Sequence, residues 1–428
     1  MTAYTVPRGT RDILPEEVVL WQFVEQKARE IFDLYNFKEI RTPIFEHTEL
    51  FQRGIGENTD IISKEMYSFL DRKGRSLTLR PEGTASVVRA YLESNRRNQE
   101  NLSKLWYQGP MFRYERPQAG RYRQFHQMGC EVLGATSAYQ DTEVIVLAQH
   151  FFESIGLQGL EVHINSVGCK TCRPVIKERL KSFLGDNLNS LCEDCRKRFE
   201  ANPLRILDCK NPKCNDFFVM LPDISDVLCA DCKEHYHEVQ NYLDIMRIKY
   251  KINPRLVRGL DYYTKTVFEI ISSHLGAQNA VCGGGRYDNL TQELGGPSIP
   301  AVGFAFGLER AVMIMQNQKV TARECRPYLL LVPLGVNAGN RAVIFANKLR
   351  RRNIPLEIDI SERGLSAKLK TANKLGVKYV YILGEDELIN KCGQLKDMQS
   401  GKQKKLKFDK FLAELEKCYN KDRSKGWN

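Results

Sequence analysis

The sequence predicts an α+β domain that is interrupted by a cysteine-rich insertion and followed by a smaller α/β domain. Three observations predict this organisation. Two strand-like runs flank a tight turn between Leu105 and Leu133, which indicates a long antiparallel hairpin. Cysteine pairs and charged helical stretches fill the chain from Asn165 to Ile252. From Arg326 onward, strand-like and helix-like runs alternate, as is typical of a small α/β domain with parallel strands.

Hydrophobic spacing predicts the elements of the first domain. Residues 1–15 form an extended arm, and the apolar residues of 16–35 recur at helical spacing. Residues 37–45 resemble a strand, and Pro43 inside it favours an edge or interface strand because proline cannot donate a ladder hydrogen bond. Later strands are expected at Val267–Ile271 and Ala301–Phe306, with helices beginning near Asp288 and Leu308.

The alternating pattern of the last hundred residues predicts the second domain. Its expected strands and helices are Tyr328–Pro333, Asn340–Arg352, Leu356–Ile360, Ser366–Leu375 and Tyr379–Leu383. We therefore expect the interrupted domain to comprise residues 1–165 and 253–322, the insertion 166–252, and the α/β domain 326–428.

Length and charge limit the class of protein. A chain of 428 residues is long enough for two to four domains, and its net charge of +12 suits either a partner that is a polyanion or simply a basic soluble surface. The longest apolar run, near Ile299–Leu308, is far shorter than the roughly 18 residues of a membrane span. The N-terminal residues lack the apolar core of a signal peptide. We therefore expect a cytoplasmic protein, in which disulfides rarely persist.

The segment MFRYERPQAGRYRQFHQMGCEV is the most informative part of the chain. Because strand side chains alternate between faces, two groups of polar side chains are each expected to share a face. These groups are Arg113 with Glu115, and Arg123 with Phe125, Gln127 and Glu131. Arginine binds phosphate through two hydrogen bonds and an aromatic ring can stack on a base, so the hairpin is expected to bind a nucleotide. A solvated surface strand is the alternative.

This segment resembles the second signature motif of the class II aminoacyl-tRNA synthetases. AVGFAFGLER, which ends at Arg310, is similar to their third motif, and NFKEIRTPIFE, with Pro43, resembles the first, which builds the dimer interface. LVRGLDYYT (256–264) and GGGRYD (283–288) resemble strings of the histidyl-tRNA synthetase family, and LRPEGT and PRGTRD also match. The resemblance spans nearly the whole chain. It implies an antiparallel sheet ringed by helices, a C-terminal anticodon-binding domain and a homodimer.

The resemblance also implies a reaction. L-histidine is ligated to tRNA(His) through a histidyl-adenylate. ATP is consumed with magnesium bound to its phosphates, and AMP and pyrophosphate are released. Neither step needs a protein nucleophile, because the site has to orient the reactants and neutralise phosphate charge. Arg113 and Arg258 match the positions that contact the α-phosphate. The residues expected to bind ATP are Arg113, Glu115 and Arg121, Phe125 under the adenine, and Arg310 at the γ-phosphate.

Histidine recognition is expected from a second set of matching positions. Glu131 and Tyr263 match the residues that bind the ring nitrogens. The other positions implied to bind substrate are Glu82, Gly83, Thr84, Gln127, Tyr262 and Tyr287, together with Arg113 and Arg258. Core packing is the alternative for each tyrosine, and a helix N-terminal position is the alternative for Glu82.

The tip of the hairpin is implied to meet the tRNA acceptor end. Arg116 and Gln118 occupy this tip. A merely solvated turn is the alternative for both, because turns favour polar residues.

Eight of the thirteen cysteines lie within one short region. They are Cys169, Cys172, Cys192, Cys195, Cys209, Cys214, Cys229 and Cys232. Repeated CxxC pairs in a cytosolic protein predict structural zinc, with unligated thiols as the alternative and His235 and His237 as other ligands. The spacing leaves one site or two open. Because the catalytic motifs lie elsewhere in the chain, we expect metal removal to weaken tRNA charging more than histidine-dependent pyrophosphate exchange.

Three other functions were weighed. A sibling synthetase for proline, threonine or glycine is disfavoured by LVRGLDYYT and GGGRYD. The synthetase-like regulatory subunit of histidine biosynthesis lacks an anticodon domain and loses catalytic positions, whereas Arg113 and Arg258 are present here. A zinc-containing nucleic-acid-binding module would explain the cysteines and the charge but none of the motifs.

Overall fold

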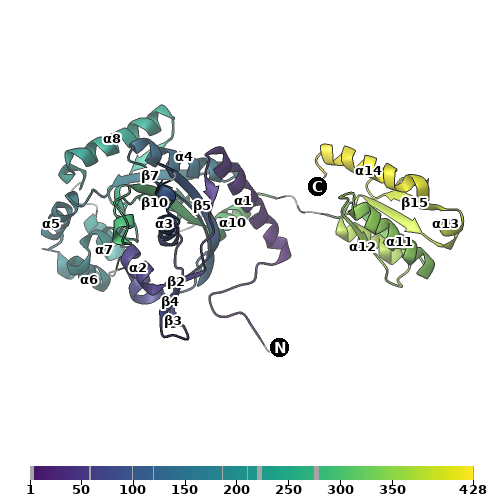
Figure 1. The fold of residues 1–428 in the computed structure, drawn as a ribbon, viewed down its shortest axis with the longest axis horizontal. Helices are drawn as coiled ribbons and strands as arrows, with labels where there is room; N and C mark the ends of the chain where they lie inside the picture. Colours follow the sequence, from purple (N-terminus) through teal and green to yellow (C-terminus); the bar gives the residue numbers. More distant parts are fainter. Residues whose placement is uncertain are drawn as a thin grey trace. The chain divides into compact units, whose positions relative to one another are not determined.

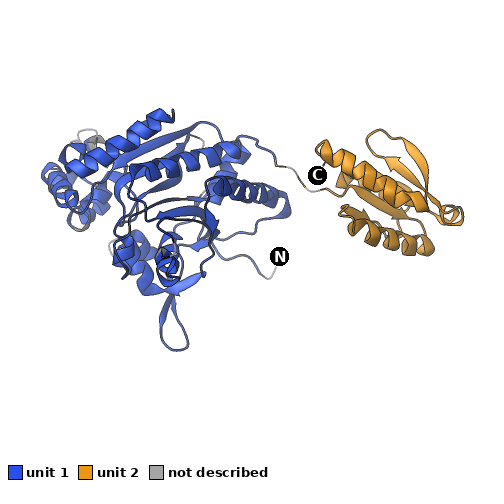
Figure 2. Ribbon diagram, turned by 45° about the horizontal axis from the view of Figure 1, so that its top comes forward, with its two compact units in different colours: residues 1–321 blue, residues 322–428 orange. Residues whose placement is uncertain are grey.

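The computed structural model describes most of the chain. The described residues are 4–56, 59–98, 100–118, 120–185, 187–209, 211–218, 224–273, 279–322, 324 and 326–427. Ala119, in the predicted hairpin turn, lies outside them. The chain separates into two compact units, Met1–Thr321 and Ala322–Asn428 (Figure 2).

An eight-stranded sheet forms the centre of the first unit (Figure 1). In spatial order its strands are β1 (Lys38–Glu39), β5 (Ser103–Phe112), β6 (Gln124–Leu133), β11 (Ala301–Gly307), β10 (Ala280–Arg286), β9 (Thr264–Ser272), β7 (Leu160–Ser166) and β8 (Tyr250–Ile252). All neighbours are antiparallel except β1–β5 and β7–β8 at the two edges. The hairpin β5–β6 pairs from Ser103 opposite Leu133 to Phe112 opposite Gln124, so the predicted hairpin is confirmed.

Helices cover one face of this sheet. They are α1 (Pro15–Leu34), α4 (Ala138–Ser154), α8 (Ala230–Ile245) and α10 (Leu308–Asn317). Their apolar stripes form one buried cluster with the sheet, in which Phe32 of α1 stacks on Trp106 of β5 at 4.9 Å between ring centres. The side chains of the opposite face pack against α3 (Thr84–Glu93) and α9 (Leu290–Glu293). The expected antiparallel sheet with surrounding helices is therefore confirmed.

The strand expected at residues 37–45 is divided between two sheets. Its first part is β1, a two-residue edge strand, and its last residue begins β2 (Phe45–His47). Pro43 lies between them, and the carbonyl of Thr42 accepts a hydrogen bond from Arg80 at 2.9 Å. A second small sheet has the order β2–β4–β3, with β3 at Tyr67–Leu70 and β4 at Ser76–Leu79. Helix α2 (Thr48–Ile55) packs against this sheet and against a π-helical turn (Ile61–Glu65), and a 3₁₀ turn (Arg96–Asn98) follows α3.

Between β7 and β8, the described elements of the cysteine-rich segment are all helices or 3₁₀ turns. Its helices are α5 (Cys172–Gly185), α6 (Glu193–Ala201), α7 (Pro212–Phe218) and α8, and its 3₁₀ turns are η3 (Leu188–Ser190), η4 (Pro203–Asp208) and η5 (Ile224–Val227). Around α6 and η4 it has only a small apolar cluster, built from Leu184, Leu191, Ile206 and cysteine side chains. So small a core gives this segment little hydrophobic stabilisation.

The second unit is an α/β domain around a five-stranded sheet. Its elements are β12 (Leu329–Pro333), α11 (Val336–Arg350), β13 (Leu356–Ile358), α12 (Leu365–Leu375), β14 (Tyr379–Leu383), α13 (Glu385–Ile389), β15 (Cys392–Asp397), β16 (Gln403–Lys407) and α14 (Phe408–Ser424). The sheet order is β13–β12–β14–β15–β16. The first three strands are parallel, as expected, whereas β15 and β16 form an antiparallel extension that was not predicted. Among the described residues, none of the helices is long and apolar enough to cross a bilayer.

Candidate active site

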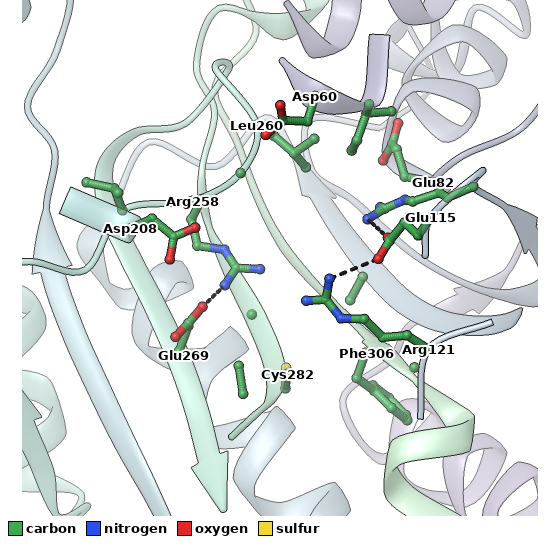
Figure 3. Close-up of a pocket in the computed structure, with 18 of the residues that line it drawn as sticks. Asp60, Glu82, Glu115, Arg121, Asp208, Arg258, Leu260, Glu269, Cys282 and Phe306 are labelled. Carbon is green, nitrogen blue, oxygen red and sulfur yellow. Dashed lines mark hydrogen bonds and ion pairs between the residues drawn. The ribbon is translucent and has the colours of Figure 1, made fainter. Parts of the chain in front are cut away.

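A cavity of about 860 Å³ opens on the sheet face that carries α3 (Figure 3). Its size is ordinary for a small-molecule site. Segments far apart in the sequence meet in it: the hairpin β5–β6, the segment before β9, β10 and the start of α10. Thirteen of the residues predicted to bind substrate or ATP line it, namely Glu82, Thr84, Arg113, Glu115, Arg121, Phe125, Gln127, Glu131, Arg258, Tyr262, Tyr263, Tyr287 and Arg310.

Glu131 is a buried carboxyl group of the cavity wall. It lies on β6 with 1% of its surface exposed, and its two oxygens accept hydrogen bonds from the hydroxyls of Thr84, at 2.7 Å, and Tyr287. Burial raises the pKa of Glu131 to about 8, against the opposing effect of these two donors. A side chain at Gly303 of β11 would collide with the Glu131 carboxylate, which explains one glycine of the AVGFAFGLER string. Glu131 is therefore held in place to receive a polar group.

The raised pKa predicts a pH-dependent stability effect of Glu131→Gln. The folded carboxyl keeps its proton up to pH of about 8, whereas the unfolded one ionises near its ordinary value of 4.5. Between these pH values the folded state binds more protons, so stability falls as pH rises. Glutamine cannot ionise and escapes this loss. We expect the variant's thermal midpoint to gain on that of the parent between pH 5 and pH 8, as measured by calorimetry. An equal difference at both pH values would contradict the prediction.

Three tyrosines form an aromatic cluster beside Glu131. The ring centres of Tyr262 and Tyr263 are 4.7 Å apart, and those of Tyr262 and Tyr287 are 5.4 Å apart. All three rings are buried, and burial raises the pKa of each phenol. Their hydroxyls therefore remain protonated and can donate hydrogen bonds inside the cavity.

Glu82 has the helix-terminal role that was considered as an alternative, and it also lines the cavity. Its carboxylate accepts the backbone N–H groups of Thr84, at 2.7 Å, and Ala85, at 2.8 Å, at the start of α3. Nearby, the Gln127 side-chain oxygen accepts the N–H of Gly83 at 3.2 Å. These contacts hold the side chains of Glu82 and Gln127 in place at an acidic and amide-rich corner of the cavity. Each oxygen of the Glu82 carboxylate still has a lone pair, so it can accept a further hydrogen bond.

The arginines of the hairpin lie where β5 and β6 separate. Arg113 donates to the carbonyl of Pro81 at 2.8 Å, and its guanidinium lies 5.4 Å from the centre of the Phe125 ring. Glu115 accepts a hydrogen bond from Arg121 at 2.9 Å (Figure 3). Arg123 does not share the face of Phe125, Gln127 and Glu131 as predicted: it precedes β6, is not among the residues that line the cavity, and stacks on the Tyr114 ring at 3.8 Å. Arg123 lies outside the ladder of β5 and β6, whose last pair is Phe112 with Gln124, so the alternation of strand side chains does not apply to it.

Arg258 enters the cavity from the opposite side and pairs with Glu269 of β9 (Figure 3). Burial disfavours its charge, but the Glu269 carboxylate outweighs burial and raises the pKa of Arg258. A side chain at Gly283 would collide with the Arg258 guanidinium, so GGGRYD provides the space that Arg258 occupies. The result is a permanently charged guanidinium with a fixed orientation.

Arg310 and Arg121 bring two positive charges to one end of the cavity. Arg310 lies at the start of α10 and donates to the carbonyl of Ala280 at 2.5 Å. Burial lowers the pKa of Arg310, and the charge of Arg121 lowers it further. Two cations that repel each other favour a bound anion.

Of the residues predicted to bind substrate, ATP or the tRNA acceptor end, three are not among those that line the cavity. Gly83 lies behind the wall, where an added side chain would collide with the Tyr107 ring. Arg116 and Gln118 are exposed at the hairpin tip, where the backbones of Gln118 and Arg121 pair with each other.

Sequence reasoning missed Glu269 and a whole wall of the cavity. Glu269 lies on β9 opposite Gly283, and only this register brings it to Arg258. The missed wall comes from the cysteine-rich segment and consists of Cys192, Glu193, Asp194, Arg198, Arg205, Asp208, Cys209 and Asn211. Two of the predicted metal ligands, Cys192 and Cys209, therefore line the cavity although the catalytic motifs lie elsewhere in the sequence.

Among the described residues, eight cysteines form two groups of four, Cys169, Cys172, Cys229 and Cys232, and Cys192, Cys195, Cys209 and Cys214. Measured Sγ–Sγ distances are 3.7 to 3.9 Å, far longer than a disulfide bond. They agree with the roughly 3.8 Å between thiolates around a tetrahedral ion with bonds of about 2.3 Å. His235 is not part of either group, because its ring bonds to the buried Asp141 at 2.7 Å, and His237 is exposed.

The sequence matches two family models. Residues 9–171 and 221–311 match the model described as histidyl-tRNA synthetase, and residues 329–418 match the anticodon binding domain. The chain belongs to the histidyl-tRNA synthetase family. Membership excludes the sibling synthetases for proline, threonine and glycine as the family of this chain. It also confirms the anticodon-binding domain expected in the second unit.

Similar members of the family resemble the chain over nearly its full length. The histidine–tRNA ligase of Desulfitobacterium hafniense is 51% identical over 97% of this chain and 98% of its own length. That of Thermodesulfovibrio yellowstonii is 48% identical over 97% of this chain and 99% of its own. The solved apo histidyl-tRNA synthetase of S. aureus has a TM-score of 0.82 at 38% identity, covering 96% of this chain and 100% of its own.

Proposed function

We propose that the chain ligates L-histidine to tRNA(His) in two steps, with ATP consumed and AMP and pyrophosphate released. The observation that carries this proposal is the meeting, in one cavity, of cationic side chains with a buried Glu131 surrounded by tyrosine hydroxyls. The arginine side chains can bind the phosphates of ATP, and Glu131 with the neighbouring tyrosine hydroxyls can form hydrogen bonds with an imidazole ring. The family and its ligase relatives support the same reaction.

The first step joins the histidine carboxylate to the α-phosphate and expels pyrophosphate. Arg113 and Arg258 both line the cavity and neutralise the charge that develops on the α-phosphate. Phe125 stacks on adenine, Glu115 and Arg121 hold the nucleotide, and Arg310 binds the γ-phosphate. Magnesium accompanies ATP in this family and supplies further neutralisation of the outer phosphates.

Selection of histidine depends on a wall that pairs both ring nitrogens. Glu131 accepts one ring N–H and Tyr263 binds the other nitrogen, while Tyr262 and Tyr287 enclose the ring. Residues at the acidic and amide-rich corner, Glu82, Gly83, Thr84 and Gln127, position the α-amino and carboxylate groups. An amino acid without both nitrogens leaves a buried polar group unpaired, which costs about 1–3 kcal/mol.

The second step transfers the histidyl group to the terminal ribose of the tRNA. The exposed Arg116 and Gln118 at the hairpin tip are available to meet the acceptor end. The second unit binds the anticodon. We assign residues 166–252 to the insertion and 326–428 to the anticodon-binding domain, and place the protein in the cytoplasm.

Pyrophosphate exchange scanned over the twenty amino acids tests this function. We expect histidine alone to stimulate exchange appreciably. Stimulation best by proline, threonine or glycine would refute the proposal, and so would the absence of exchange with every amino acid.

Each cysteine group is proposed to hold one structural zinc ion. Four thiolates form the closed tetrahedral set typical of such sites, and backbone N–H groups already donate to the Cys172 and Cys214 sulfurs at 3.1 and 3.3 Å. Elemental analysis should therefore find two zinc ions per chain. Chelation should make the insertion sensitive to protease, because metal binding supplies folding free energy. Metal-free protein that resists protease equally with and without chelator would contradict this prediction.

A homodimer is proposed through the segment around Pro43. Ile44, Phe45, Phe69 and Leu70 are exposed on or beside the small sheet that begins there. Exposed apolar side chains that cluster on a surface mark contact sites. Light scattering at micromolar concentration should give twice the chain mass. A monomer mass would contradict the prediction, and Phe69→Lys should shift a true dimer toward monomer.

A further inference from the structure

We infer that the second cysteine group, through Arg205, sets the rate of histidine activation. Arg205 is here a positioning residue for Arg258, and the metal held by Cys192, Cys195, Cys209 and Cys214 keeps Arg205 in place. The inference rests on the proposed function. It concerns residues 172–220, which the family model does not match.

This unmatched segment forms one side of the catalytic cavity. Cys192 and Cys209 line the cavity themselves, as do Asp208 and Asn211. Asp208 lies on the same side of the cavity as Arg258 (Figure 3). The segment therefore belongs to the active site in this chain, although its cysteines are not part of the family motifs.

Arg205 holds the backbone next to Arg258. Its side chain is only 11% exposed, and it donates to the carbonyl of Gly259 at 2.6 Å while pairing with Asp60 at 3.3 Å. Residues 256–263 belong to neither a helix nor a strand, so contacts from outside determine their position. Asn202 adds a second contact, to the Asp261 carboxylate at 2.8 Å.

The cysteines fix the two elements that carry these side chains. Cys192 is the residue before α6, and Cys209 is the residue after η4, which contains Arg205. Their sulfurs are 3.7 Å apart. One ion bonded to all four thiolates therefore ties the start of α6 to the end of η4, where the apolar cluster is small. Without the ion, thiolate repulsion separates these ends and Arg205 loses its position.

Loss of the Arg205 contact is expected to affect the position of Arg258 but not that of Tyr263. Tyr263 is held separately, because Arg173 of α5 donates to its carbonyl. Loss of Arg205 should therefore displace Arg258 more than the histidine-binding wall. Small displacements of a reacting arrangement reduce rates steeply, by as much as about 100-fold per ångström. The kcat of activation should fall while the KM for histidine changes little.

A double-mutant cycle in the full-length protein tests the inference. The variants are Arg205→Ala, Cys214→Ser and the pair, with Cys392→Ser of the second unit as a matched cysteine control. Arg205→Ala should lower the kcat of histidine-dependent exchange at least about 10-fold, with the KM for histidine within about 3-fold of the parent. Cys214→Ser should lose one metal ion per chain and show the same fall. The pair should fall no further than either variant alone, because both act through one contact.

Several results would overturn the inference. They are a normal kcat in Arg205→Ala, a normal kcat in metal-depleted Cys214→Ser, and fully additive effects in the pair. Arg205→Lys, which keeps a donor and a charge, should recover part of the rate, and no recovery with an intact fold would count against positioning. Hydrogen exchange across residues 256–263 should rise in Arg205→Ala even if Cys214→Ser fails to fold. Parent protein that shows no histidine-dependent exchange refutes the proposed function, whereas an active parent with unaffected variants refutes only this inference.

Discussion

Replacing Arg258 by alanine should lower the rate of histidyl-adenylate formation by 100-fold or more, leaving the overall fold in place. The guanidinium is a fixed charge in a partly enclosed cavity, where one oriented donor is worth about 10²-fold or more in rate. Single-turnover adenylate formation measures this loss directly, and a near-normal rate would exclude the role of Arg258.

The design has to separate lost catalysis from lost stability. Arg258→Ala leaves the Glu269 carboxylate without its paired cation. The double variant Arg258→Ala with Glu269→Gln removes that charge and should be as inactive as the single variant but closer to the parent in thermal midpoint. Arg352→Ala is the matched control, because Arg352 pairs with Glu416 in the second unit and should not affect adenylate formation.

Glu131→Gln should lower kcat/KM for histidine by about 10-fold to 100-fold, mainly through KM. The change replaces the carboxyl group by an amide, which leaves the imidazole imperfectly paired in a buried site, at a cost of about 1–3 kcal/mol. Steady-state exchange at varied histidine concentration measures the effect.

A matched glutamate outside the cavity serves as the control for Glu131. Glu143 of α4 pairs with Lys104 at 2.6 Å and is not among the residues that line the cavity, so Glu143→Gln should leave kcat/KM unchanged. If the Glu131→Gln variant has the KM for histidine of the parent, a group other than Glu131 recognises the imidazole ring.

Local pattern and motif resemblance predicted much of this fold and thirteen of the residues that line the cavity. The predicted strand at Tyr379–Leu383 has the observed bounds. A short apolar run between polar segments is typical of a buried strand, so its two ends can be located from the sequence. β15 and β16 were missed because their sequence is rich in lysine and polar residues. They become strands only through tertiary pairing, β15 with β14 and β16 with β15.

Contacts that depend on distant register were beyond prediction. Nothing near Glu269 in the sequence indicates that it meets Arg258, since the contact requires β9 and β10 to pair at Gly283. The sorting of eight cysteines into two groups of four also depends on the fold, because the spacing permits several pairings. Arg205 has no motif at all and gains its role only from the position of η4 against the segment that follows Val257.

The two cysteine groups are nested along the chain, and this nesting fixes the order in which their ligands are synthesised. The inner group is complete once Cys214 has left the ribosome, whereas the outer group waits for Cys229 and Cys232. The four ligands of the proposed inner zinc site, Cys192, Cys195, Cys209 and Cys214, are therefore all present while the outer group still has only two. Closure of the inner site shortens the loop that the outer group must later bridge, which lowers the entropic cost of that second closure. The part of the cavity wall that carries Cys192 and Cys209 is thus synthesised before the strands β9, β10 and β11 that complete the cavity.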